Sequence, residues 1–275
     1  MKKLLPLFVL VTFVVAVSFT PVQEFQGQAI YISKSTMELG NWGARMSEAQ
    51  KKQVKARLKN RLEKTYTLNF NKVESVFDEE DKLDAMSGAT DSWGKNFARG
   101  KQYKNVKENA LVQNQEFYGK KFLVKDGLQE FNWNMGSETK QIGQYTCFKA
   151  SALVPTDDLT WFDFSWGKLR RQQAQQNDTV SGAPEIEMTQ IVAWYTPQIP
   201  VSHGPAEYWG LPGLILEVNA GNTTMLCSKI VMNPKESLKI AAPDKGKIVD
   251  KEEYKVTVLG KMQEMLENRG RRRSR

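Results

Sequence analysis

The sequence predicts an α+β fold in a single domain: one large, curled antiparallel β-sheet, a half-open barrel, with a helix near each end. Three observations favour it. Short apolar runs with period-two alternation follow one another along most of the 275 residues. Turn-like segments separate these runs, so the alternation of strands and helices typical of parallel sheets is missing. Helical patterns occur only at 47–64 and 250–268. A sheet of about seven to ten strands tends to curl.

The elements follow from local patterns, taken in chain order. Ser47 and Gln50 form a capping box that starts a basic helix ending near residue 64. Asp250 is the expected N-cap of the last helix, with Glu253 completing a second capping box. Strands are expected where apolar and polar residues alternate, namely at 25–33, 65–77 (a pair), 106–114, 115–125, 129–134, 144–153, 186–196, 214–219 and 223–232.

The first eighteen residues have the pattern of a secretory signal peptide. Lys2 and Lys3 precede an apolar stretch at 4–17, and small residues follow at the spacing that a signal peptidase accepts. The stretch is shorter than the roughly twenty residues that a membrane-spanning helix needs. We therefore expect cleavage near residue 18 and a mature protein that begins near Phe19, without a transmembrane segment. Its location would be the periplasm, the outer membrane surface or the medium.

The rest of the chain is expected to form one domain over 19–268, because no proline-rich linker divides it. Two polar segments without periodicity, 78–105 and 165–184, are expected to be mobile loops. Residues 269–275 hold five arginines and are expected to be a basic, disordered tail.

The distribution of charge argues against a nucleic-acid-binding protein. The formal net charge is +8. Cleavage of the leader removes Lys2 and Lys3, and the tail carries five further positive charges, so the body of the domain is near +1. A nearly neutral body lacks the basic surface that nucleic acids require.

Two cysteines, Cys147 and Cys227, lie in predicted strands. An even number in an exported chain permits a disulfide, provided that the two strands are neighbours. The alternative is two buried free thiols.

Candidates for catalysis are few. The chain has one histidine, His203, so a three-histidine metal site is impossible and a histidine-dependent triad would need this residue. Glu207 is the nearest acid to it in sequence. Asp157, Asp158 and Asp163 form an acidic cluster beside Trp161 and Trp166, a combination compatible with sugar chemistry. No cofactor and no metal ion is expected.

Prolines and glycines concentrate between the strands at 186–196 and 214–219. They predict a stiff corner, because proline fixes φ and glycine permits unusual φ. Trp194, His203, Tyr208 and Trp209 are the candidate binding residues there. The corner is either a lip over a cleft or a plug that closes one end of the sheet.

The same segment carries a resemblance. It contains the hexapeptide that names the GLPGLI family, exported proteins of Bacteroidota-type bacteria whose function is not established. Ala193–Thr196 and Ile199-Pro200 before it, and Thr139–Gly143 upstream, are similar to other blocks of that family. The resemblance covers nearly all of the mature chain. The motif residues are Gly204, Pro205, Gly210, Leu211, Pro212, Gly213, Leu214 and Ile215.

The sequence therefore favours a non-enzymatic binding or accessory protein of the cell envelope. It would hold an apolar ligand, a peptide or a partner protein on the concave face of the sheet, since aromatic side chains are plentiful and catalytic groups are scarce. The alternative is a periplasmic hydrolase, directed at glycans or peptides, that uses carboxylates such as Asp163 and Glu207.

Overall fold

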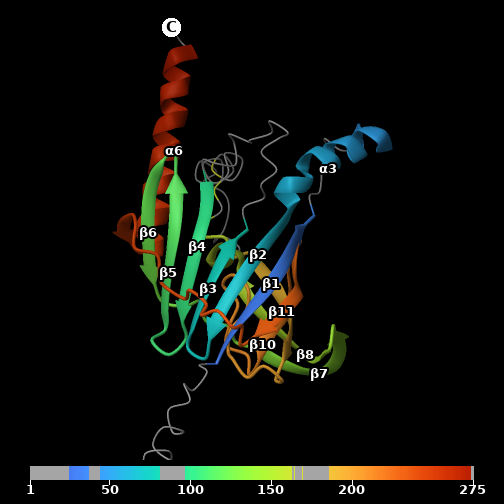
Figure 1. The fold of residues 1–275 in the computed structure, drawn as a ribbon. Coiled ribbons are helices and arrows are strands. Elements are labelled where there is room, and N and C mark those ends of the chain that lie inside the picture. Colours follow the sequence, from blue (N-terminus) through green and yellow to red (C-terminus); the bar gives the residue numbers. More distant parts are fainter. Residues whose placement is uncertain are drawn as a thin grey trace, which may run out of the picture.

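The computed structural model of the protein describes residues 25–36, 44–80, 97–162 and 186–273, together with Phe164 and Leu169. The expected signal peptide and most of the segment 165–184 lie outside these residues. The described strands form one sheet of twelve, in the order β12-β6-β5-β4-β3-β2-β1-β11-β10-β9-β8-β7. The sheet is curled but not closed (Figure 1). The predicted fold class is confirmed, with more strands than expected.

One half of the sheet is a meander that runs from the middle to one edge. Neighbouring strands in it are antiparallel, and the short edge strand β12 alone is parallel to its neighbour, β6. Short turns join β2 to β3, β4 to β5 and β5 to β6, which makes these neighbouring strands antiparallel. The strands are β1 (Gln26–Ser35), β2 (Glu63–Asn71), β3 (Glu74–Glu79), β4 (Phe97–Asn105), β5 (Ala110–Phe117), β6 (Lys120–Asp126) and β12 (Lys247–Val249).

The other half is a second antiparallel meander. It is joined to the first where β1 pairs with β11, so that β1 lies between β2 and β11. Its far edge is β7, the last strand in the order. The strands are β7 (Asn134–Ile142), β8 (Tyr145–Pro155), β9 (Met188–Thr196), β10 (Leu214–Ala220) and β11 (Thr223–Met232).

Three helices accompany the described part of the sheet: α3 (Glu48–Leu62), α4 (Thr156–Leu159) and α6 (Lys251–Arg273). The capping box of Ser47 and Gln50 is present as predicted. At α6 the Asp250 carboxylate accepts the backbone N–H of Glu253, whereas the Glu253 side chain accepts from Lys247 instead of closing a box. Helix α6 stands beside β6, and α3 projects from the end of β2 (Figure 1).

Several predicted boundaries are wrong. Residues 97–105 are strand β4, not loop, because polar side chains on this strand face the protein interior. The strands expected at 106–114 and 115–125 are shifted to β5 and β6, since turns at Asn109 and Tyr118 have positive φ. The strand expected at 129–134 is absent, and β7 begins only at its last residue. Residues 269–273 are helical rather than a disordered tail.

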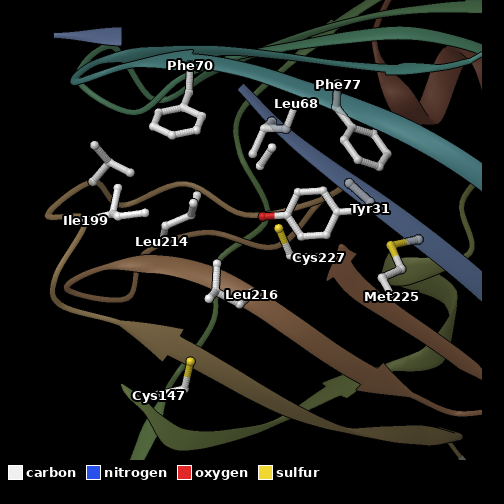
Figure 2. Packing of buried hydrophobic residues seen from close by; sticks show 13 residues of the cluster. Tyr31, Leu68, Phe70, Phe77, Cys147, Ile199, Leu214, Leu216, Met225 and Cys227 are labelled. Atoms are coloured by element: carbon white, nitrogen blue, oxygen red, sulfur yellow. The ribbon is translucent and has the colours of Figure 1, made fainter. Parts of the chain in front are cut away.

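Three clusters of buried apolar side chains hold the fold together. The central cluster surrounds Tyr31, whose hydroxyl donates to the carbonyl oxygen of Ile215 at 2.6 Å. Figure 2 shows Tyr31 between Leu68 and Phe77 on one side and Leu216 on the other. A second cluster is formed by buried side chains of β8, β9 and β10, against which Leu211 packs. In the third, Tyr254, Val258 and Met262 of α6 pack on β6.

Candidate functional site

The segment 197–213 folds back onto the inner face of the sheet, the face that carries Tyr31 and Phe70. Ile199, Val201 and Ala206 of this segment belong to the same buried cluster as those two aromatic residues. A backbone bridge between His203 and Trp209 closes the segment into a compact corner. The corner therefore occupies part of the hollow of the curled sheet.

A buried lysine ties the corner to strand β4. The Lys104 Nζ donates to the carbonyl oxygens of Gly204, Ala206 and Tyr208 at 2.8, 2.7 and 3.0 Å. Lys104 has no solvent-exposed surface. Burial of an ammonium group is tolerated only where such acceptors replace its hydration.

Neighbouring polar groups extend this contact. The Gln102 amide nitrogen donates to the Glu207 carboxylate at 2.7 Å. Gln102 lies two residues before Lys104 on β4, so a second inner-facing side chain of this strand is hydrogen-bonded to the corner. His203 is completely buried, and neither ring nitrogen has a hydrogen-bond partner. Burial, and next the charge of Lys104, lower its pKa to about 3, while the Asn71 backbone acts weakly in the opposite direction. The ring is therefore neutral at physiological pH.

Beside the Lys104 contact lies a group of buried polar side chains with unpartnered atoms, which we call the glutamine patch. The unpartnered atoms are Ser75 Oγ, Gln102 Oε1, Gln113 Nε2, Gln115 Nε2 and Trp161 Nε1. None of these five residues is more than 5% exposed. In the native state each such atom costs about 1–3 kcal/mol unless water or a ligand satisfies it.

The register of the strands places the patch on one continuous surface. Gln102 lies directly opposite Gln113 on the neighbouring strand. Gln113 and Gln115 are two residues apart on β5 and so share its inner face. Across β6 their partners are Val124 and Phe122, which belong to the same cluster as Trp161.

The amide orientations of Gln102 and Gln113 are determined by the network. A carboxylate accepts but cannot donate, so the nitrogen of Gln102 must face Glu207. The same nitrogen lies 3.4 Å from the Gln113 oxygen. The Gln102 oxygen and the Gln113 nitrogen are thereby left over, one an acceptor and the other a donor.

The four candidate binding residues occupy different environments. Trp194 lies on β9 beneath Lys140, whose Nζ is 4.4 Å from the ring centroid. His203 is inside the protein, where no solvent reaches it. Tyr208 and Trp209 are half-buried in the corner, and the Trp209 indole donates to the Gln129 carbonyl at 2.6 Å. The corner is thus held by hydrogen bonds on both sides, to Lys104 and to Gln129.

The motif residues have mainly close-packing roles in this corner. A Cβ on Gly213 would lie 2.2 Å from the Thr196 carbonyl oxygen. Gly204 is similarly enclosed, by Ile215 and the Tyr208 carbonyl. Gly210 has a φ of +92°, in the region that favours glycine. Leu211, Leu214 and Ile215 are buried.

Both cysteines are free and buried. They lie on β8 and β11, which β9 and β10 separate, so the neighbouring-strand arrangement that the expected disulfide requires is not present. Burial raises the pKa of Cys147 to about 11 and that of Cys227 to about 12.

The acidic residues considered for hydrolysis do not share one environment. Asp157 and Asp158 are exposed in the first turn of α4, whereas Glu207 is buried against β4. Asp163 and Trp166 lie outside the described residues. The described residues contain no group of three or more histidine, cysteine, aspartate or glutamate side chains that could hold a metal ion.

Sequence reasoning missed Lys104 and the glutamine patch. The available signal is the alternation of Leu111, Gln113, Gln115 and Phe117, in which two polar residues occupy positions in phase with apolar ones. Such a pattern indicates polar side chains on a buried face. The sequence analysis used this alternation only to place a strand and did not infer that Gln113 and Gln115 are buried.

Comparisons with known proteins find a family model that matches part of the chain. The model of a family described as "Protein of unknown function (Porph_ging)" matches residues 133–217, the segment from the start of β7 through the corner into β10. No curated protein matches the chain.

Two solved structures of PNGF-II, in space groups C2 and P21, are similar to this chain, each with a TM-score of 0.47 and 14% sequence identity. They align with 85% of this chain, which spans about a third of their length, 32% and 33%. Within the described residues, none of the helices has the length and apolar character needed to cross a membrane.

Proposed function

We propose that the protein is an exported, non-enzymatic binding protein of the cell envelope, of the GLPGLI type, that holds a small uncharged, hydroxyl-bearing molecule at the glutamine patch. The observation that carries the proposal is the set of unpartnered polar atoms of Ser75, Gln102, Gln113 and Gln115 on one inner surface of β3 to β5. The unpartnered Trp161 Nε1 belongs to the adjoining apolar cluster. Buried polar groups in proteins are normally satisfied, so this many in one place points to an absent partner.

The chemistry of the patch selects the ligand class. It offers donors from Gln113, Gln115 and Trp161 and an acceptor from Gln102. An apolar ligand would leave all of them unsatisfied, so the proposal departs from the apolar ligand expected from the sequence. A hydroxyl group both donates and accepts, and therefore matches a mixed set of this kind.

The charges near the patch favour an uncharged ligand. Lys104 already donates to three carbonyl groups, and Glu207 already accepts from Gln102. An ionised ligand buried here would need a counter-charge, without which the cost of desolvation is prohibitive. The ring of Phe122 beside the patch and the ring of Trp161 within it provide surface for the carbon skeleton of a polyol or a sugar.

The hydrolase alternative has less support. Glu207 is engaged by Gln102, and the only histidine is buried and neutral. A hydrolytic site needs a carboxylate or an imidazole that can reach both substrate and water. The patch instead supplies uncharged amides, which can hydrogen-bond a ligand but do not act as general acids or bases at neutral pH.

Native mass spectrometry and thermal unfolding test the proposal. Protein purified from envelope fractions is first examined for bound small molecules. The melting temperature is then measured with glycerol, glucose and N-acetylglucosamine, and with phosphate and palmitate as charged and apolar comparisons. We expect at least one of the uncharged compounds to raise the melting temperature. Phosphate and palmitate should leave it unchanged.

A double substitution, Gln113→Leu with Gln115→Leu, should abolish the stabilisation by ligand. Without ligand it should leave the melting temperature unchanged or raise it, since the unpaired donors are removed with little change of shape. Gln190→Leu, on the exposed side of β9, is the matched control and should keep the response. The proposal is overturned if a high-resolution crystal structure shows only water in the patch and no uncharged probe shifts the melting temperature.

A further inference from the structure

We infer that strand β7 pairs with β7 of a second copy of this chain, antiparallel about a two-fold axis at Thr139, to form a weak dimer. This surface is separate from the glutamine patch. The inference starts from the asymmetry of the two sheet edges. One edge is the three-residue strand β12, flanked by α6, whereas β7 at the other edge is nine residues long. The first part of β7, residues 134–139, is exposed throughout.

The hydrogen-bonding phase of β7 determines which backbone groups face outward. Ile142 pairs with Tyr145 across a two-residue turn. The residues that flank such a turn hydrogen-bond to each other, and the pattern alternates along the hairpin. Lys140 therefore directs its backbone groups toward β8, while Thr139 and Gln141 direct theirs to the open edge. An open row of this kind is a template for another strand.

Charge then selects one register among those that this phase permits. A two-fold axis at Lys140 would place Lys140 opposite its own copy, and an axis at Glu138 would oppose two glutamates. An axis at Thr139 pairs Thr139 with itself and sets Glu138 opposite Lys140 of the second copy. Opposite charges across strands stabilise a pair, and like charges destabilise it.

The existing ion pairs extend this complementarity. Within one copy the Lys149 Nζ lies 2.7 Å from Glu138, and the Lys140 Nζ lies 2.6 Å from Glu217. In the proposed dimer these pairs join into a row of alternating charge: Lys149 and Glu138 of one copy, then Lys140 and Glu217 of the other. The two-fold axis generates the row twice.

The interface is expected to be small. β7 departs from regular pairing between Met135 and Thr139, which limits the new ladder to the residues around Thr139. A contact of this size falls below the range of stable interfaces, so the dimer should dissociate in the micromolar range or more weakly. Sedimentation velocity over a wide concentration range is therefore the appropriate measurement.

Charge reversal provides the decisive test. Glu138→Lys alone and Lys140→Glu alone each create like-charge contacts in both halves of a homodimer, and each should raise the dissociation constant at least tenfold. A mixed dimer holds one copy of each variant. In this mixed dimer, the new lysine at position 138 of one chain faces the new glutamate at position 140 of the other. At the second contact the native Lys140 of the first chain faces the native Glu138 of the second. The mixture should therefore dimerise as tightly as the wild type, within about threefold.

A structural effect within one copy cannot produce this recovery on mixing, because each chain keeps its own substitution. Thr139→Pro, which removes an outward N–H, should also prevent dimer formation while preserving the melting temperature. Wild-type protein that stays monomeric at all concentrations overturns the inference. The inference is also overturned if the single variants dimerise as tightly as the wild type, or if the mixture of the two variants does not regain the wild-type dissociation constant.

Discussion

The Lys104 Nζ donates a 2.7 Å hydrogen bond to the carbonyl oxygen of Ala206, a residue 102 positions further along the chain. Ala206 has a φ of +48°, a left-handed conformation that costs a non-glycine residue about 1–2 kcal/mol. The lysine thus holds the corner in a backbone shape that it would not adopt alone. The contact joins the two meanders through the inside of the sheet.

Lys104→Met should destabilise the protein by about 3 kcal/mol or more, because three buried carbonyl groups lose their donor. Lys101→Met, on the same strand but at the surface, should change the free energy of unfolding by less than about 1 kcal/mol. Urea denaturation of both variants provides the measurement. Equal stability of the two would show that the buried ammonium does not support the corner.

Gly213→Ala should destabilise the fold because the new Cβ meets backbone atoms of Thr196 and Pro197, which cannot move aside. A cost of about 1–3 kcal/mol is expected for overpacking of this kind. Gly260→Ala is the control: nothing lies near its Cβ position, and alanine favours a helix by about 1 kcal/mol. Opposite shifts in the two melting temperatures are expected, and a neutral Gly213→Ala would contradict the packing argument.

His203 should make the stability depend on pH. Its pKa is about 3 in the folded protein and close to 6.5 in the unfolded chain, so between these values only the unfolded chain binds the proton. The contribution to stability is complete above pH 6.5 and falls by up to about 1.4 kcal/mol per pH unit below it. Urea denaturation at pH 7 and pH 5 measures this decrease in the free energy of unfolding. His203→Gln should make the decrease smaller. If the variant loses as much stability as the wild type between these pH values, other groups cause the pH dependence.

The two thiols should resist modification in the native protein. Burial raises their pKa values to about 11 and 12, so little thiolate is present at pH 8. In denaturant without reductant both should react with a maleimide reagent, giving two labels per chain. Failure to label under those conditions would instead reveal a disulfide.

Export can be tested at the N-terminus. The mature protein should begin near Phe19, as determined by N-terminal sequencing of secreted or periplasmic material. Val14→Arg interrupts the apolar stretch and should prevent processing, because a charge disrupts the apolar region of a signal peptide. Detection of Met1 on the exported wild-type protein would exclude cleavage.

The sequence predicted the parts of the fold that depend on local patterns. Strand β11 has the predicted bounds, 223–232, because alternation and the turn before it are both local signals. Strand β4 was missed because Gln102 and Lys104 face inward, and hydrophobic periodicity assigns such residues to the surface. Their partners are corner residues about a hundred positions away, which no local pattern reveals.

The candidate site shows the same limit. The corner was predicted from its prolines and glycines, whose backbone preferences are intrinsic. The surface on which it packs, the inner face of β1 to β4, lies far away in the sequence and could not be predicted. The importance of Gln113 and Gln115 depends on atoms left unpaired after folding, and only the assembled sheet makes those visible.

The position of β1 has a consequence for how the protein folds. β1 is the first described strand, yet it pairs with β11 near the other end of the chain, with Gly27 opposite Met232. The loop closed by this pairing spans nearly the whole domain, so its entropic cost is met only after the second meander has formed. Until then the free side of β1 is an unprotected template, and a chain truncated before β11 should aggregate through it.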